Sequence, residues 1–318
     1  MDTTKRYRRR WGKPYVDKRQ WKAYNEELVV RGEFLLDLHW VKSWDDELRA
    51  MNEGKRGHPY GFPESLIEIQ AIWNQWIGLR QVEGITRSLV EIAQLPEFND
   101  YSTINRRIRK IKPCFELPKQ GFCSVSTDGT GMKMHNAGAY REMRYGNKKR
   151  RWVRIVISAN PLTKDLLDLE VSLDGQGSSE PNVAMRHLSG LYNSGIVVDK
   201  FWGDGAFDVI DLFNLLERNG TESAIPPRSS ASGEARGSMR RAREVREFMA
   251  RGYEEWARDK QYGKRWLGTE VIFSAVKVIF GENTRAKTPE TACLEASRKF
   301  WCYERMRKYA LMRTRQSS

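Results

Sequence analysis

The 318-residue chain lacks the features that mark secreted, disulfide-stabilised and membrane-spanning proteins. Its four cysteines, Cys114, Cys123, Cys293 and Cys302, are too few and too widely spaced for a disulfide scaffold or a zinc ribbon, so we expect reduced thiols. No window approaches the roughly 18 consecutive apolar residues of a membrane span. The first residues are basic and aromatic without an apolar core, which is unlike a secretory signal peptide. We therefore expect a cytoplasmic protein with no membrane partner.

Acidic residues are also fewer than basic residues. The 55 Lys and Arg exceed the 41 Asp and Glu, and the formal net charge is +14. Such an excess favours a polyanionic partner, because Lys and Arg that replace condensed counterions drive nucleic-acid binding. A basic protein that is merely soluble would have the same composition. The length allows one or two domains with a sizeable core.

The first third of the chain has helical periodicity. After a basic arm at residues 1–24, helices are predicted from Pro63, over 84–94 and from Ser102, where Ser102 and Thr103 cap the last helix. This last helix carries Arg106, Arg107 and Arg109. Two short helices and a turn, with a basic second helix, are typical of a helix-turn-helix. A helix pair with a solvated basic face is the alternative. We expect a helical DNA-binding domain over 25–117 in which these three arginines contact DNA.

Beyond this region the pattern changes to alternating strands and helices. Strands are predicted at 122–127, 152–158, 166–173, 196–203 and 222–225, and helices at 181–192, 209–218 and 266–280. The third strand alternates apolar and polar residues like an antiparallel, half-exposed strand, whereas the fourth is nearly all apolar like a buried parallel strand. Three antiparallel strands followed by helices and strands in turn are the order of an RNase H-like domain, an α/β fold with a mixed sheet. We place it at 118–290, with a charged insertion at 229–258 and a basic helical tail at 291–318.

Asp128 and Asp204 each follow a predicted strand and precede a glycine. Asp-Gly is also a frequent turn dipeptide, so neither residue is distinctive alone. In an RNase H-like sheet, however, the first and fourth strands are neighbours, and two carboxylates at their ends would lie side by side. Hard divalent cations such as Mg²⁺ prefer oxygen ligands of this kind. The strand order therefore indicates a metal site.

The last predicted helix of this domain supplies a third carboxylate. Glu270 and Lys277 fall on one face of the helix. The opposite face, which would pack on the sheet, carries Ile272, Val276 and Ile279. A solvated Glu–Lys face on an ordinary surface helix is the alternative. Tyr262 and Arg265 before the glutamate, and Phe-Gly-Glu at 280–282 after it, favour a functional role for Glu270.

Three segments carry a recognisable pattern: Ser-Thr-Asp-Gly-Thr-Gly at 126–131, Gly-Asp-Gly-Ala-Phe-Asp at 203–208, and 262–282. They resemble the DDE transposases of bacterial and archaeal insertion sequences, in the insertion-sequence-five group. That family's signature is Tyr, two residues, Arg, three residues, Glu, six residues, Lys. The chain has Tyr262, Arg265, Glu270 and Lys277, but four residues separate the arginine from the glutamate. Segments 79–84 and 100–103 are similar to the family's helical DNA-binding region, so the resemblance spans about 60–285.

The resemblance implies a transposase that binds the ends of an insertion sequence, cuts them by metal-dependent phosphodiester hydrolysis and joins the 3′-OH ends to target DNA. Asp128, Asp204 and Glu270 would be catalytic and would hold two Mg²⁺ (or Mn²⁺) ions roughly 4 Å apart. Arg265 and Lys277 would bind DNA phosphates. The expected partners are transposon ends and target DNA, in a homodimer or larger synaptic complex on the nucleoid of a bacterium or archaeon. A helix-turn-helix regulator without catalysis and an RNase H-like nuclease without strand transfer remain open as alternatives.

Overall fold

The structure is a computed structural model that describes residues 20–119, 121–134 and 152–316, and it divides into two units. One unit joins the chain up to His39 with the segment from Arg305 onward. It holds α1 (Trp21–Glu33), the 3-10 turn η1 (Phe34–Leu36) and the end of α11 (Pro289–Gln316). The other unit, Trp40–Glu304, holds the predicted site. The expected basic arm falls mostly on residues 1–19, outside the described residues.

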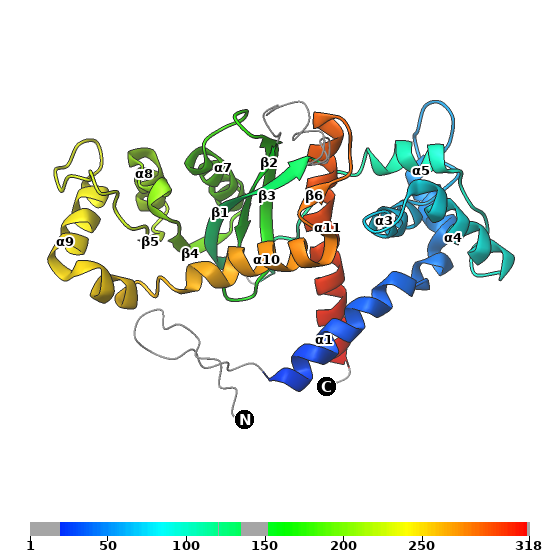
Figure 1. Cartoon of the computed structure of the whole chain (residues 1–318), viewed down its shortest axis with the longest axis horizontal. Coiled ribbons are helices and arrows are strands. Elements are labelled where there is room, and N and C mark those ends of the chain that lie inside the picture. Colours follow the sequence, from blue (N-terminus) through cyan, green and yellow to red (C-terminus); the bar gives the residue numbers. More distant parts are fainter. Residues whose placement is uncertain (1–19, 120, 135–151, 317–318) are drawn as a thin grey trace, which may run out of the picture. The chain divides into compact units, whose positions relative to one another are not determined.

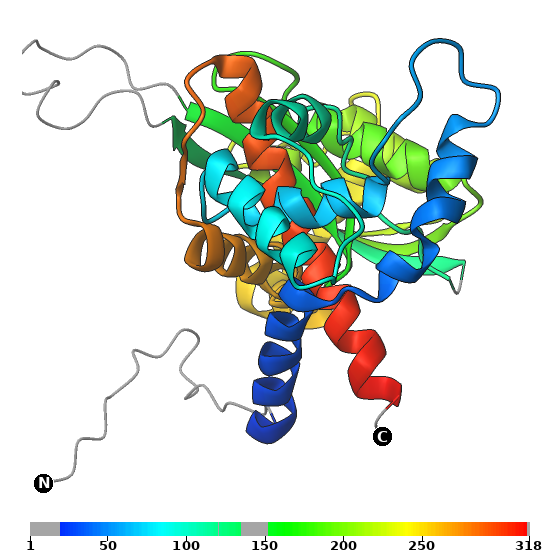
Figure 2. The same ribbon diagram turned by 90° about the vertical axis from the view of Figure 1, so that its right-hand side faces the viewer.

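The second unit begins with short helices. They are the 3-10 turn η2 (His39–Ser43), α2 (Trp44–Asn52), α3 (Glu64–Trp73), α4 (Leu79–Glu91) and α5 (Tyr101–Ile108), of which α3, α4 and α5 lie together (Figures 1 and 2). The predicted helical region is thus present. The predicted cap is wrong: Asp100 caps α5, because its carboxylate accepts hydrogen bonds from the Ser102 and Thr103 amides at 2.8 and 3.0 Å.

A mixed sheet follows. Its strands are β1 (Phe122–Met134), β2 (Trp152–Ala159), β3 (Leu166–Leu173), β4 (Val197–Trp202), β5 (Glu222–Ala224) and β6 (Asn283–Thr284). The spatial order is β3-β2-β1-β4-β5, with β6 beside β1. β1, β2 and β3 pair antiparallel, whereas β4 is parallel to both β1 and β5. This arrangement confirms the predicted mixed sheet, including the first and fourth strands as neighbours.

The first strand is longer than the sequence pattern predicts. β1 was expected to end at Thr127, but it continues through Asp128 to Met134 because β2 pairs with it as far as Lys133. The parallel partner β4 stops earlier, at the pair Ser126–Trp202, and β6 joins only at Lys133. In the described part of the chain, residues 127–132 therefore have a neighbouring strand on one side only. We call this stretch the open edge of β1.

Helices pack on both faces of the sheet and beside its β5 edge. They are α7 (Glu180–Asn193), the 3-10 turn η3 (Gly205–Phe207), α8 (Ile210–Arg218), α9 (Met239–Asp259) and α10 (Lys264–Phe280) (Figure 1). Neighbouring residues of β1 point to opposite faces, as in any strand. Ser126 donates a hydrogen bond to the Arg265 carbonyl of α10 (3.1 Å), whereas Thr127 bonds Ser158, which bonds His187 of α7. Thus α7 and α10 lie on opposite faces, and both reach the open edge.

The charged insertion is anchored to the sheet. Its helix α9 is interrupted at Gly252, whose φ of 72° is outside the helical range. Beyond this break, the fully buried Trp256 packs with Trp202 of β4 and with Tyr262. Near the start of α9, Arg241 forms a bidentate ion pair with the buried Asp208 at 2.6 and 2.8 Å. The insertion therefore supports the loop that follows β4.

The first half of α11 is a core element of the second unit. Ala292, Ala296 and Phe300 are fully buried. The buried Lys299 ammonium donates hydrogen bonds to the carbonyls of Phe280, Gly281 and Asn283, at 2.9, 3.3 and 2.5 Å. It thereby satisfies carbonyl groups where α10 ends and β6 begins. The helix expected beyond residue 291 is thus present, and its first half holds α10 in place.

Candidate active site at the open edge of the central strand

Asp128 lies on the open edge of β1, on the face covered by α10. Its side chain is 17% exposed and accepts a hydrogen bond from the Arg265 guanidinium at 3.0 Å. Burial raises its pKa, the Arg265 charge and a hydrogen bond from the Gly129 amide lower it, and the charges of Asp204 and Glu270 raise it. The net direction is upward. The three predicted carboxylates are therefore close enough to repel one another.

Asp204 enters this site from the neighbouring strand. The last β1–β4 pair is Ser126–Trp202, so Asp128 and Asp204 each stand two residues beyond it. The Asp204 carboxylate accepts a hydrogen bond from the Ala206 amide at 2.8 Å, which fixes the start of η3. The two aspartates are neighbours because β1 and β4 are parallel and in register. The alternative, that both Asp-Gly pairs form turns, does not hold at Asp128, which lies within β1.

Glu270 reaches the site from α10. Its side chain is 51% exposed, whereas Ile272 and Val276 on the other side of the helix are fully buried. The helix approaches the sheet closely at Gly268, where an added Cβ would stand 3.1 Å from the Ser126 Cβ. A larger residue there would push α10, and Glu270 with it, away from β1.

Arg265 connects two of the carboxylates. One guanidinium nitrogen lies 3.0 Å from Asp128 and another lies 3.8 Å from Glu270. The guanidinium also lies over the rings of Tyr262 and Trp266, 5.7 and 5.5 Å from their centroids. Its Nε atom is buried without a hydrogen-bond partner in the described part of the chain. In this state the arginine expected to hold phosphate is engaged with the carboxylates instead.

The donor set suits a hard divalent cation. Asp128, Asp204 and Glu270 offer only carboxylate oxygens, the ligands preferred by Mg²⁺ and Mn²⁺. Among the described residues, no three His, Cys, Asp or Glu side chains are close enough to bind a metal ion as they stand. The Arg265 guanidinium instead supplies the positive charge at Asp128 and Glu270. The residues therefore fit a metal ion, provided that Arg265 moves when the ion binds.

The residues predicted to bind DNA lie in different surroundings. Arg106 of α5 and Arg109, at the C-cap of that helix, are exposed, and Lys277 is half-buried in the last turn of α10. Arg107 differs from this expectation. It is buried, pairs with Glu64 at 2.7 Å and lies over the Tyr60 ring. Its side chain is buried within the helical region and bonded there, so we propose no DNA contact for Arg107.

The structure adds one acidic residue that the sequence pattern did not single out. Glu180 is the first residue of α7, on the face of the sheet opposite α10. Its pKa is raised by burial first and then by the charges of Asp128 and Asp204, whereas Arg154 lowers it. An acidic residue in the first turn of a helix is common, so the sequence alone carries no signal for this placement.

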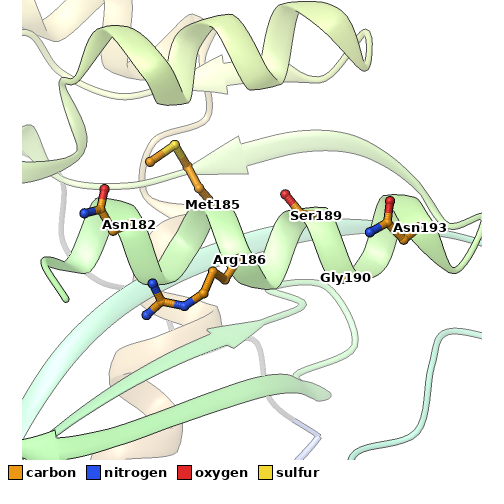
Figure 3. Close-up of a pocket in the computed structure, with 6 residues that line it drawn as sticks. All are labelled: Asn182, Met185, Arg186, Ser189, Gly190 and Asn193. Atoms are coloured by element: carbon orange, nitrogen blue, oxygen red, sulfur yellow. The ribbon is translucent and has the colours of Figure 1, made fainter. Parts of the chain in front are cut away.

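Two cavities flank α7. The larger, about 560 Å³, lies over the outer surface of the helix and is lined by Asn182, Met185, Arg186, Ser189, Gly190 and Asn193 (Figure 3). None of the carboxylates described above lines it. The smaller, about 340 Å³, lies over β1 and β2 and is lined in part by Gly129, Arg154 and Glu180. Only this second cavity adjoins the open edge.

The mixed sheet with helices on both faces, and three carboxylates beside its central strand, define the class of the fold as an RNase H-like domain. Two family models, each described as a transposase DDE domain, match residues 29–137 and 120–304. The second covers more than half of the chain and includes Asp128, Asp204 and Glu270. The chain therefore belongs to the DDE transposases, enzymes of DNA transposition that generally use divalent metal ions. No helix in the described ranges is long and apolar enough to cross a membrane.

Proposed function

We propose that the chain is the transposase of a prokaryotic insertion sequence of the insertion-sequence-five group. It binds the ends of the element, cuts them and joins the freed 3′-OH ends to target DNA. The observation that carries the proposal is the common position of Asp128 and Asp204, two residues beyond the last β1–β4 pair, with Glu270 supplied from α10. Membership of the DDE family supports the same reaction.

The reaction consists of two in-line displacements at phosphorus. Water attacks first, and the 3′ oxygen of the element leaves as a hydroxyl group. That hydroxyl then attacks a target phosphodiester, whose own 3′ oxygen leaves. Asp128, Asp204 and Glu270 would hold Mg²⁺ or Mn²⁺, and the bound metal would supply activation of the attacking oxygen and stabilisation of the leaving one. Arg265, released from Asp128, and Lys277 hold the phosphate, the first as a bidentate fork and the second as a point charge.

The helical region positions the DNA. Arg106 and Arg109 are exposed at the C-terminal end of α5, where they suit phosphate or base-edge contacts. Two ends must be cut and joined together, so the acting form is a homodimer or a larger synaptic complex. The net charge of +14 supports binding of both the ends and the target.

The test is to incubate the purified protein with a duplex that carries the inverted repeats flanking its gene, with Mg²⁺ and a target plasmid. The proposal expects cut ends and joined products, and it expects neither when EDTA is present. Binding without cleavage in either Mg²⁺ or Mn²⁺ would instead identify a DNA-binding regulator. Cleavage without joining would identify a nuclease.

Single substitutions at the three carboxylates test the assignment. Asp128→Ala, Asp204→Ala and Glu270→Ala should each reduce cleavage by more than the ~10–100-fold that loss of a supporting residue around a metal ligand costs. End binding should remain within about 2-fold, because these residues contact metal and not phosphate. Asp211→Ala, at an exposed carboxylate of α8, is the matched control and should cut normally. A variant that keeps substantial cleavage would remove its residue from the site.

A further inference from the structure

The open edge of β1 has a helix on each face of the sheet, α10 on one and α7 on the other. β4 stops at Trp202, so no strand of the described structure borders residues 127–132 on that side. On one face, α10 brings Arg265 and Glu270 to Asp128. On the other, α7 brings Glu180. A ligand bound at this edge can therefore receive side chains from both helices.

Glu180 is held close to Asp128 by the backbone. Its carboxylate lies directly against Gly129, the residue after Asp128, so closely that a Cβ at position 129 would overlap its Oε1 atom. Gly129 has no positive φ, so backbone freedom does not require a glycine here. The absence of a side chain is what admits the carboxylate. The glutamate at position 180 can therefore take this position only while position 129 is a glycine.

The Glu180 carboxylate has no hydrogen-bond or ion-pair partner among the described residues, although it is half-buried. It lines the cavity of about 340 Å³ together with Gly129 and Arg154. A half-buried carboxylate that only favoured the helix N-terminus would be expected to bond a backbone amide there. Instead it lines the cavity, and the charges of Asp128 and Asp204 add to burial in raising its pKa.

We propose that Glu180 is a fourth carboxylate of the active site, giving an oxygen ligand, directly or through one water molecule, to the divalent cation held by Asp128 and Asp204. The inference rests on the proposed function. The adjoining cavity offers space for the water molecules that Mg²⁺ retains when protein carboxylates bind it. A cation bound between Asp128, Asp204 and Glu180 would reduce the repulsion among them.

Metal affinity of the full-length protein without DNA tests this role. Mn²⁺ binding, followed by electron paramagnetic resonance of the free ion, should be about 10-fold or more weaker in Glu180→Gln than in the wild type. Gly129→Ala should weaken binding in the same direction, because its Cβ displaces the carboxylate while leaving its charge in the protein. Asp174→Asn is the matched control. It removes the same charge from the lining of the same cavity and should bind Mn²⁺ as the wild type does.

The outcomes separate the two proposals. If Glu180→Gln binds Mn²⁺ as tightly as the wild type while Asp128→Asn does not, the role of Glu180 is wrong and the metal site stands. If Asp174→Asn is weakened as much as Glu180→Gln, the effect is general electrostatics and the role is equally wrong. If the wild type binds no Mn²⁺, the proposed function itself fails. A lower melting temperature of Glu180→Gln with unchanged Mn²⁺ affinity would show a helix-terminus role and would also overturn the inference.

Discussion

Among the individual residues, Arg265 has the most unusual surroundings. Its guanidinium is close to both Asp128 and Glu270, although it stands one residue away from the position that the family signature gives an arginine before the glutamate. A guanidinium and a divalent cation would compete for the same carboxylate oxygens. We therefore propose that the arginine is the counter-charge of these carboxylates when no metal is bound, and that a bound metal would free it to bind phosphate.

This competition predicts the effect of removing the arginine. Arg265→Ala should bind Mn²⁺ at least about 5-fold more tightly than the wild type, because two like charges about 4 Å apart repel by about 1 kcal/mol even in water. Cleavage should nevertheless fall, since the phosphate contact is lost. Lys277→Ala removes the same charge from the same helix without touching these carboxylates and should leave Mn²⁺ affinity unchanged. Equal or weaker Mn²⁺ binding by Arg265→Ala would contradict the competition.

How far a residue's role can be predicted from the sequence depends on how many roles its type commonly has. Asp128, Asp204 and Glu270 could be proposed as site residues because their order along the chain matches one strand topology. Glu180 was not, since glutamate in a first helical turn is ordinary. Arg107 was predicted to contact DNA, but a basic residue of a short helix can face either water or an acidic neighbour. Only the packing of α5 against Glu64 decides between them.

Among the elements, the strand β1 is longer than its local sequence pattern predicts. The pair Asp128-Gly129 is typical of a turn, and residues 128–131 contain two glycines, which weaken strand propensity. The strand continues because β2 supplies backbone partners up to Lys133, a long-range contact that no local window contains. The other strands and the helices around them were predictable, since their periodicities are strong. The site lies where local propensity and tertiary pairing disagree.

The helix α5 allows a prediction with a control on the same helix. Replacing Arg106 and Arg109 together by Ala should weaken end binding and lower the salt slope by about 2, as expected for two lost phosphate contacts at ~0.9 each. Stability should be unchanged, because both side chains are exposed. Arg107→Ala should instead cost about 1–3 kcal/mol of stability by removing a buried side chain together with its bonds to the Phe62 carbonyl and to Glu64. DNA titrations at several salt concentrations and urea unfolding measure the two effects, and an unchanged slope in the double variant would move the DNA-binding surface away from α5.

For the molecule as a whole, we expect the buried carboxylates of the site to lower stability when no cation is bound. Burial raises the pKa of both Asp128 and Glu180 in the folded protein. Between the ordinary pKa of a carboxyl group and these raised values, the folded state binds more protons than the unfolded state. These two groups therefore make stability fall as pH rises through that window, and their full cost is present above it. Gly268, which lets α10 approach the sheet, and Lys299, which holds the end of that helix, keep the carboxylates together against this repulsion.

This cost predicts how stability responds to pH and to metal. In EDTA near neutral pH, the double variant Asp128→Asn/Glu180→Gln should melt at a higher temperature than the wild type. The difference should shrink as the pH is lowered toward about 4, where the wild-type carboxyl groups take up protons. Mg²⁺ at about 100 times its dissociation constant should stabilise the wild type by about 2.7 kcal/mol and leave the double variant unaffected. Calorimetry across this pH range, with and without Mg²⁺, measures both effects. A double variant that melts below the wild type at neutral pH in EDTA would mean that the Arg265 ion pair outweighs the burial of these carboxylates, and that the site does not reduce the stability of the metal-free protein.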